Sequence, residues 1–188
     1  MRTTAPGQSA LLLLDVIPAL QERHIAYAII GAFAASFYGV VRASLDADAV
    51  ISLPKTSAVE ELCQYFRGQN LKVEYRRGDS EDPVGAVLNV EDSFCNRVDL
   101  LIGIRKMPQE VFQRAQEARF MDTLIKIVSV EDFIALKLFA GSPKDIQDIA
   151  DVLKVSGKNM DFNLLRKLAG VYGSDCVQKL NRLLEEKI

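Results

Sequence analysis

Apolar residues recur along the chain with two spacings, one typical of helices and one typical of strands. Apolar positions three to four residues apart predict a helix over residues 9–20, which Pro18 is expected to kink or shorten. Short apolar runs predict strands over residues 26–30 and 46–52, and the segment between them predicts a helix over residues 32–38. The chain is therefore expected to begin with a helix followed by a strand–helix–strand unit.

The middle of the chain is predicted to contain a helix, three strands in close succession, a second helix and a final short strand. Gly, Asp and Pro residues separate the three strands, which predicts a meander that continues the same sheet. The expected ranges are residues 55–67 for the first helix, 71–76, 86–91 and 97–103 for the meander, 108–118 for the second helix and 124–128 for the last strand.

From residue 129 onward the pattern is helical throughout. Ser129 begins a Ser-x-x-Asp capping pattern, and Ser142 followed by Pro143 marks the start of the next helix. Two more helices are expected over residues 161–169 and 174–186.

Together these elements predict an α/β (α+β) fold, with a mixed sheet, flanking helices and a small C-terminal helical bundle. No repeat, low-complexity tract or long linker interrupts the chain, so one compact unit is expected. We place the α/β core at residues 1–128 and the helical segment, packed on that core, at residues 129–188.

Composition and charge are those of an ordinary globular protein. The 188 residues are 49% hydrophobic and 26% charged, which is enough for one sizeable core. The formal net charge of −2 gives no overall basic footprint for a nucleic acid, although a local patch is compatible with it. Three widely spaced cysteines without a CxxC pair indicate neither a disulfide framework nor a zinc site.

A membrane location is not expected. The uncharged run over residues 26–41 is shorter than the roughly 20 residues that a spanning helix needs, and two glycines interrupt it. The N-terminal residues show no export signal. We therefore expect a cytoplasmic protein with no membrane partner.

Two carboxylates stand inside an otherwise apolar strand. Asp46 and Asp48 are two residues apart, so on a strand they lie on one face and repel each other. Asp99 is a third acid in an apolar strand, and a neighbouring strand would place it beside the pair. A divalent cation resolves such a conflict, and two metals at such a site can support phosphoryl-type transfer.

The turn before the helix adds a second signal. Gly31 followed by the small Ala32 lets backbone N–H groups at the start of a helix approach a phosphate closely. Arg42 and Ser44, just before the acids, add a positive charge and a hydroxyl for the same ligand. Each feature alone has an ordinary alternative: Gly31 as a simple tight turn, and Asp46 as a turn or strand-start residue.

These residues resemble the nucleotidyltransferase superfamily, whose pattern is a strand, a Gly-Gly or Gly-Ser turn, a helix and then Arg-x-Thr-x-Asp-x-Asp. The matching stretch here is IIGAFAASFYGVVRASLDADAVIS. A later stretch, VEDFIALKLFAGSPKDIQDIADVL, is similar to the helical motif of compact bacterial AbiEii-type proteins, which are toxins of toxin–antitoxin pairs. The resemblance extends over about residues 25–153.

The resemblance implies a role for each matching residue. Gly31 and Ala32 would bind the triphosphate with Arg42 and Ser44, and Lys137 would approach the nucleotide phosphates. The acid positions would hold Mg²⁺ or Mn²⁺, with Asp99 either completing the metal site or acting as a base. The implied metal and catalytic residues are Asp46, Asp48 and Asp99. Asp145 and Asp148 match acids of the family motif without an assigned task.

Other readings of the same residues remain open. Lys137 is equally compatible with a surface lysine whose stem lies along apolar neighbours. Residues 75–82 are expected to form a solvated hairpin. A local basic patch for an RNA acceptor is the alternative, and it would consist of Lys72, Arg76, Arg77, Arg97, Arg105 and Lys106.

Three functional hypotheses follow. The first is a metal-dependent nucleotidyltransferase that passes an NMP from an NTP to a hydroxyl acceptor, possible acceptors being tRNA, a protein or a small molecule, with an antitoxin as a protein partner if the chain is a toxin. The second is a catalytically degenerate member that binds a nucleotide or a partner, because Ala32 lacks the hydroxyl of the family's serine. The third is an antibiotic-modifying enzyme with a small-molecule acceptor.

Overall fold

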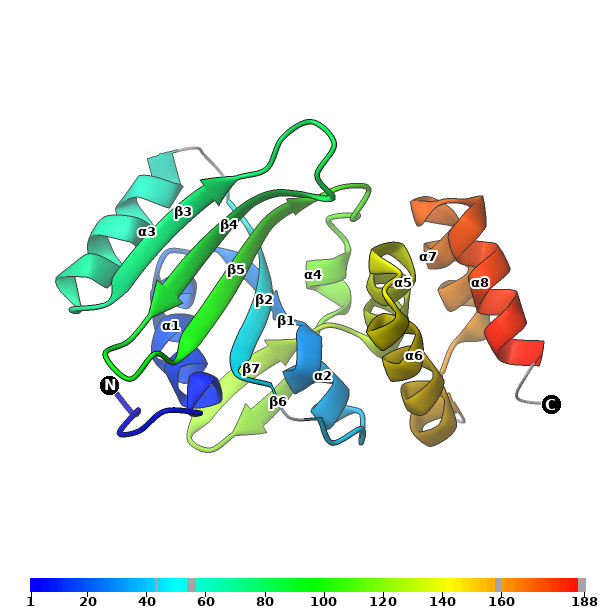
Figure 1. Ribbon diagram of the computed structural model, residues 1–188, viewed down its shortest axis with the longest axis horizontal. Helices are drawn as coiled ribbons and strands as arrows, with labels where there is room; N and C mark the ends of the chain where they lie inside the picture. The colour runs from blue at the N-terminus through cyan, green and yellow to red at the C-terminus, as the bar shows by residue number, and fades with distance from the viewer. Residues whose placement is uncertain (43, 54–56, 158–159, 186–188) are drawn as a thin grey trace.

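The structure of the protein is a computed structural model that describes residues 1–42, 44–53, 57–157 and 160–185. Seven strands form one mixed sheet in the order β3-β4-β5-β2-β1-β7-β6 (Figure 1). Strands β2 and β5 pair in parallel, as do β1 and β7, and the other neighbours are antiparallel. The strands are β1 (Ala26–Ile29), β2 (Asp46–Ser52), β3 (Lys72–Arg77), β4 (Val84–Glu91), β5 (Arg97–Ile104), β6 (Gln116–Phe120) and β7 (Thr123–Ile127).

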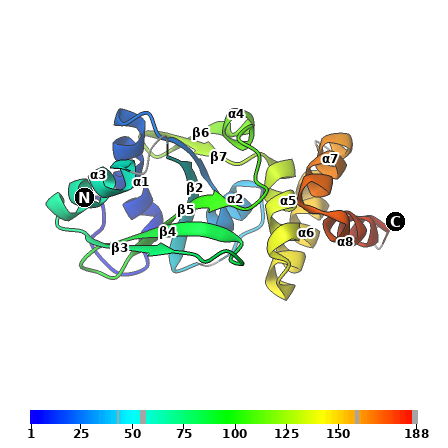
Figure 2. The same cartoon turned by 90° about the horizontal axis from the view of Figure 1, so that it is seen from above.

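Helices α1 (Ser9–Glu22) and α3 (Ser57–Gly68) cover one face of the sheet, whereas none of the described helices covers the other face of β3, β4 and β5 (Figures 1 and 2). The expectation that Pro18 shortens α1 is wrong, because the helix continues to Glu22. Proline cannot donate a hydrogen bond to the carbonyl of Leu14. The guanidinium of Arg2 donates to that carbonyl instead, over 2.9 Å.

The predicted strand–helix–strand unit is confirmed as β1, α2 (Gly31–Phe37) and β2. The helix begins directly at the end of β1, where the amide of Ile30 donates to the carbonyl of Asp48 over 3.0 Å. This bond holds the start of α2 against the beginning of β2. The predicted meander of β3, β4 and β5 is also confirmed, since these strands are neighbours with antiparallel pairing.

The predicted helix over residues 108–118 is wrong in its second half. The chain forms a short helix α4 (Val111–Arg114) and then strand β6, which pairs with β7 through a tight turn at Met121 and Asp122. Gln116–Phe120 has no strand-like alternation strong enough to outweigh its helix-forming composition. Pairing with β7 at five positions decides its conformation, because tertiary context overrides weak local propensity.

The C-terminal part is helical, as expected, and consists of α5 (Val130–Ala140), α6 (Pro143–Ser156), α7 (Phe162–Tyr172) and α8 (Ser174–Glu185). The Ser129 hydroxyl accepts from the amide of Asp132 at the start of α5, and Ser142 forms a complete capping box with Asp145 at α6. Residues 55–56, the predicted start of α3, and residue 186, the predicted end of α8, lie outside the described residues.

The α/β class with a C-terminal bundle is therefore confirmed, while the boundary between residues 128 and 129 stays a prediction. Side chains from α1, the sheet, α5 and α7 share one hydrophobic core. None of the described helices combines the length and apolar character needed to cross a membrane.

Candidate active site

The acids of β2 lie on the face of the sheet that α1 and α3 leave uncovered. Asp46 is exposed and Asp48 half-buried, whereas Ala47 and Ala49 between and after them are buried against the core. Strand β5 runs parallel to β2 and places Asp99 directly opposite Asp48. The structure thus brings the three predicted acids onto two adjacent strands and one face.

The surroundings of Asp48 disfavour the ionised form of its carboxyl group. Burial, together with the nearby negative charges of Asp99 and Asp46, raises the pKa of Asp48 to about 6, although Lys137 and Arg42 act in the opposite direction. Ionisation of this carboxyl group near pH 7 costs free energy, and a bound cation would reduce that cost.

Gly31 supplies the space that this carboxylate occupies. A Cβ atom at position 31 would lie 2.2 Å from Oδ2 of Asp48, which is closer than atoms can approach. Gly31 also has a φ of +66°, a conformation that side chains disfavour. Two independent constraints therefore require glycine at the start of α2, beside the acid pair.

Asp99 is held by two residues that the sequence analysis did not assign to the metal site. The guanidinium of Arg97 donates to both carboxylate oxygens, with Nε 2.6 Å from Oδ1 and Nη2 2.8 Å from Oδ2. Asn89 on β4 donates to Oδ1 over 2.6 Å. The only sequence signal for Arg97 was its position two residues before Asp99, which puts both on one face of β5.

One feature of this site favours a divalent cation, and another limits how many of the acids can bind it. Carboxylate oxygens are the ligands that Mg²⁺ and Mn²⁺ prefer, and the raised pKa of Asp48 favours a positive neighbour. Within the described residues, no three His, Cys, Asp or Glu side chains are gathered closely enough to hold a metal by themselves. A cation would bind to Asp46 and Asp48 first, and Asp99 would join only if Arg97 released it. The three-acid metal set accordingly stays a prediction.

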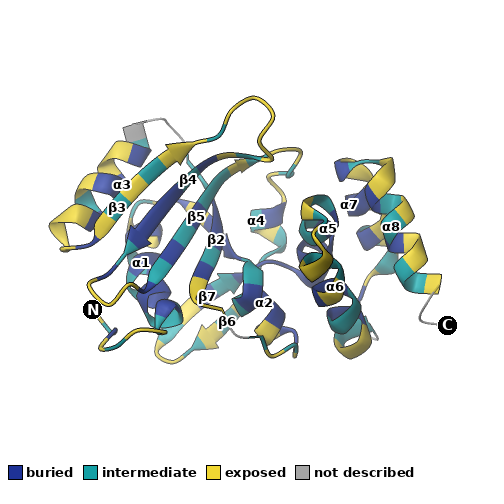
Figure 3. Ribbon diagram, viewed as in Figure 1, coloured by how far each residue is buried: buried dark blue, intermediate teal, exposed yellow. Residues whose placement is uncertain are grey.

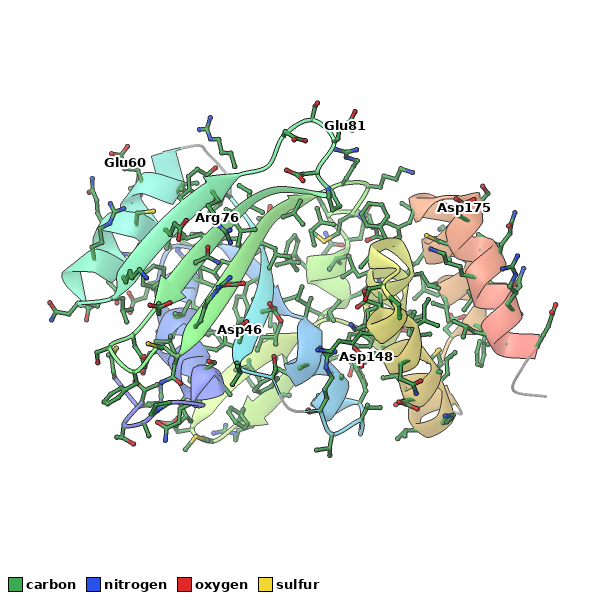
Figure 4. All side chains as sticks on the ribbon, viewed as in Figure 1. Asp46, Glu60, Arg76, Glu81, Asp148 and Asp175 are labelled. Atoms are coloured by element: carbon green, nitrogen blue, oxygen red, sulfur yellow. The ribbon has the colours of Figure 1, made fainter. Side chains whose placement is uncertain are left out.

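Lys137 and Arg42, both predicted to bind nucleotide, are joined by Asp148. The Nζ atom of Lys137 lies 2.7 Å from Asp145 and 2.8 Å from Asp148, and Arg42 forms an ion pair with the same Asp148 carboxylate. This chain of ion pairs, which we call the Asp148 network, connects the loop before β2 with α5 and α6. Figure 4 shows Asp46 at the start of β2 and Asp148 on α6.

The network also decides what Lys137 can still do. Its side chain is only 11% exposed, so it is not the solvent-facing lysine of the alternative reading. Two of the three ammonium N–H groups face Asp145 and Asp148, which leaves one donor for a ligand. Burial would raise the pKa of Asp145, but hydrogen bonds from Lys137 and Ser142 hold it below its usual value.

Two cavities open beside the acids. The first, here called the lysine cavity, has a volume of about 180 Å³ and is lined by Gly31, Lys137 and Asp145 together with apolar residues of β5 and α5. The second, here called the aromatic cavity, has a volume of about 440 Å³. Its lining comes from α1, α2, the following loop and β6, and includes Ala32, Phe33, Ser36, Phe37, Arg42, Ser44, Asp46 and Phe120.

The predicted nucleotide residues are thus divided between the two cavities. Ala32, Arg42 and Ser44 line the aromatic cavity, whereas Gly31 and Lys137 line the lysine cavity. Ala32 is buried in α2 and Ser44 is exposed in the loop. The structure does not bring all five around one pocket, although each lies on a segment that borders the acids.

Most residues of the alternative basic patch are paired with acids or with backbone carbonyls. Lys72 pairs with Glu91, Arg76 with Glu74, and Arg97 with Asp99 on the open face of the sheet. Arg105 donates to backbone carbonyls of residues 80 and 82, and Lys106 donates to the carbonyl of Tyr172. This arrangement gives the sheet alternating charges rather than a continuous positive surface.

The sequence matches one protein family over nearly its whole length. Residues 10–186 match the family described as "Nucleotidyl transferase of unknown function (DUF2204)". The chain belongs to this nucleotidyl transferase family. None of the curated proteins compared with it matches. Membership confirms the superfamily that the Gly31 turn and the Asp-x-Asp strand predicted, while the AbiEii-type assignment rests on the sequence motifs.

Several solved structures share the fold of this nucleotidyl transferase. The antibiotic-resistance protein ANT(2″)-Ia, solved with adenylyl-2″-tobramycin, is 18% identical with a TM-score of 0.57 over 88% of this chain and 96% of its own. An antigenic nucleotidyltransferase-like protein from Paracoccidioides brasiliensis is 16% identical, with a TM-score of 0.55 over 98% and 91%. The lincosamide adenylyltransferase LnuA, solved with lincomycin, is 12% identical, with a TM-score of 0.51 over 81% and 99%.

Proposed function

We propose that the protein is a metal-dependent nucleotidyltransferase that transfers an NMP from an NTP to a hydroxyl acceptor and releases pyrophosphate. Family membership supports a transferase, and one observation supports the chemistry: Asp48 is forced beside Asp46 and opposite Asp99, with a pKa raised to about 6. Such a carboxylate favours a bound cation, which is the requirement for a triphosphate substrate.

Each residue of the site has a task in this proposal. Asp46 and Asp48 would hold Mg²⁺ or Mn²⁺, and the metal would supply charge stabilisation for the phosphates and the leaving group. Gly31 leaves the backbone at the start of α2 open to the triphosphate, and the remaining N–H of Lys137 donates to a phosphate oxygen. Arg42 is held by Asp148 beside the acids and contributes positive charge.

Asp99 has a different first task from the one expected. Its two hydrogen bonds from Arg97 fix a guanidinium next to Asp46, because residues 46 and 97 are opposite each other on β2 and β5. This position lets Arg97 stabilise the negative charge that develops on the phosphates during transfer. Asp99 would serve as metal ligand or base after Arg97 has moved to the nucleotide.

The test is calorimetric titration of each NTP, with and without Mg²⁺, into the wild-type protein and into an Asp46→Ala, Asp48→Ala double variant. We expect Mg²⁺-dependent binding of at least one NTP to the wild type and its loss in the double variant. The matched control is an Asp151→Ala, Asp175→Ala double variant, which removes two acids from α6 and α8 and should bind as the wild type does.

The same titration decides between catalysis and a degenerate binding module. Absence of Mg²⁺-dependent binding to the wild type would rule out the transferase and favour the module, for which Ala32 was the motive. NTP binding without Mg²⁺ that survives the double substitution would favour a nucleotide-binding module whose acids have another role.

A small-molecule acceptor is the second candidate function, and the solved structures favour it. Two proteins of the same fold were solved with an adenylylated antibiotic or an antibiotic bound. The toxin function of the AbiEii type rests on the helical motif of α5 and α6. It predicts that expressing the wild-type protein, but not the Asp46→Ala, Asp48→Ala variant, arrests bacterial growth.

A further inference from the structure

The aromatic cavity has a volume typical of sites for drug-sized ligands, and no residue in its lining is shared with the lysine cavity. Phe33, Phe37 and Phe120 contribute three aromatic rings, and Phe33 meets Phe120 edge to face with 5.0 Å between the ring centroids. This contact between the two rings places the cavity beside α2 and β6. Asp46 lies at its border, so a molecule held there reaches the first acid of the site.

The geometry of an in-line displacement assigns a different substrate to each of the two cavities. In an in-line displacement the attacking and leaving oxygens approach phosphorus from opposite sides. The proposed pyrophosphate contacts, Gly31 and Lys137, belong to the lysine cavity, which lies against β5 and α5. The aromatic cavity reaches Asp46 from α1, α2 and β6, so it is suited to the attacking molecule.

Charge restricts the kind of acceptor. Arg42 and Asp46 are the two charged residues in the cavity lining, and Arg42 is already paired with Asp148. A polycation needs several carboxylates and an RNA backbone needs several free cations, and this lining supplies neither. Most of the cavity lining offers uncharged, apolar contact area to a ligand.

Residues in the cavity lining, or next to it in the sequence, also include exposed apolar side chains. Four large apolar side chains on the α2 end, the following loop and the β6–β7 turn are exposed to solvent. These are Phe37, Val41, Leu45 and Met121. Figure 3 shows exposed residues on these segments, at the same end of the molecule as the start of α1.

From these observations we propose that the aromatic cavity binds the acceptor, and that the acceptor is an uncharged small molecule with an aromatic or fused-ring body and a free hydroxyl group. This inference rests on the proposed nucleotidyl transfer and names its substrate class. The hydroxyl oxygen bonds to the α-phosphorus of the NTP, the bond from that phosphorus to the pyrophosphate oxygen breaks, and the hydroxyl proton passes to solvent water.

The experiment measures pyrophosphate release with saturating NTP and Mg²⁺ from a panel of flavonols, hydroxysteroids and aryl alcohols, with tRNA and a polycationic aminoglycoside as contrasting acceptors. Ser36→Phe fills the cavity and Phe37→Ala removes part of its wall. Ser93→Phe and Phe94→Ala make the same changes in the exposed turn between β4 and β5 and serve as matched controls. NTP affinity is measured separately by titration for every variant.

We expect turnover with members of the panel, a tenfold or larger rise in the acceptor KM for Ser36→Phe and Phe37→Ala, and an NTP Kd within twofold of wild type in all four variants. Three results would overturn the inference: turnover only with tRNA or the aminoglycoside, an acceptor KM that neither cavity variant changes, or no turnover with the panel while Mg²⁺-dependent NTP binding is intact. Loss of NTP binding in the wild type is a different result, because it removes the proposed function itself and the inference with it.

Discussion

Asp48 carries the most informative single-residue prediction, because its ionisation opposes folding. Its pKa is raised to about 6 in the folded protein, whereas the unfolded chain has the ordinary value of 3.8. The folded state therefore binds more protons between these values, and stability falls as the pH rises through that window. We expect Asp48→Asn to be more stable than wild type at pH 8, by up to about 3 kcal/mol, with the difference gone below pH 4.

Urea unfolding at pH 4 and pH 8 measures this difference directly. Equal stabilities of Asp48→Asn and wild type at pH 8 would mean that solvent or a rearrangement already relieves the repulsion. Asp151→Asn, on the exposed side of α6, is the control, and its stability should follow that of the wild type at both pH values.

Gly31 should matter more for binding than for stability. Gly31→Ala forces a side chain into a positive-φ conformation, which costs about 1–2 kcal/mol, and displaces the Asp48 carboxylate that now occupies the space. We expect Mg²⁺–NTP affinity to fall at least tenfold, beyond what the loss of stability explains. The comparison is with Gly7→Ala, where φ is also positive but the added Cβ meets no neighbouring atom.

At the residue scale, the sequence predicted the acids better than their partners. The alternation of β2 was enough to place Asp46 and Asp48 on one face, because the strand period is two. Arg97 contacts Asp99 along β5 itself, whereas Asn89 contacts Asp99 only through the register of β4 with β5, and register depends on how the whole sheet pairs. No local pattern in the sequence contains that information.

Among the elements, α5 and α6 depend on the Asp148 network. Asp148 is almost fully buried and forms ion pairs with Lys137 on α5 and Arg42 in the loop before β2. Removing one partner of a buried ion pair leaves uncompensated charge and costs several kcal/mol. We expect Asp148→Ala to destabilise the protein by about 3 kcal/mol.

Asp151→Ala, one turn further along α6, tests whether burial is the cause. Asp151 makes an exposed ion pair with Lys154, and pairs of that kind contribute less than about 1 kcal/mol. Thermal or urea unfolding of both variants should show a large loss for Asp148→Ala alone. Equal small losses would mean that the network contributes little to stability.

Element prediction succeeded where local signals and tertiary structure agree. Ser129 and Ser142 combine caps with apolar periodicity, and α5 and α6 begin where those residues predict. The strand β6 is the exception, since its residues 116–120 are polar and form an edge of the sheet. An edge strand paired on one side only has a weak pattern, so its identity depends on β7.

For the whole molecule, the core and the helical segment are expected to unfold together. Ser156 at the end of α6 donates to the carbonyl of Tyr38 at the end of α2 over 3.1 Å. Phe133 and Leu138 of α5 lie in the same core as the sheet. Residues 1–128 and 129–188 are thus fastened to each other by packing as well as by charge.

Differential scanning calorimetry tests this. We expect one transition whose calorimetric and van't Hoff enthalpies agree, because the shared core prevents either part from unfolding alone. Two resolved transitions, or a van't Hoff enthalpy well below the calorimetric one, would show that the two parts fold independently.

The bond from Arg2 to Leu14 has a practical consequence for recombinant work. Arg2 replaces the donor that Pro18 lacks, and its guanidinium also contacts Asp15 and Asp122. Any recombinant version of the protein should therefore keep this arginine, because replacing it would leave a helix carbonyl without a partner.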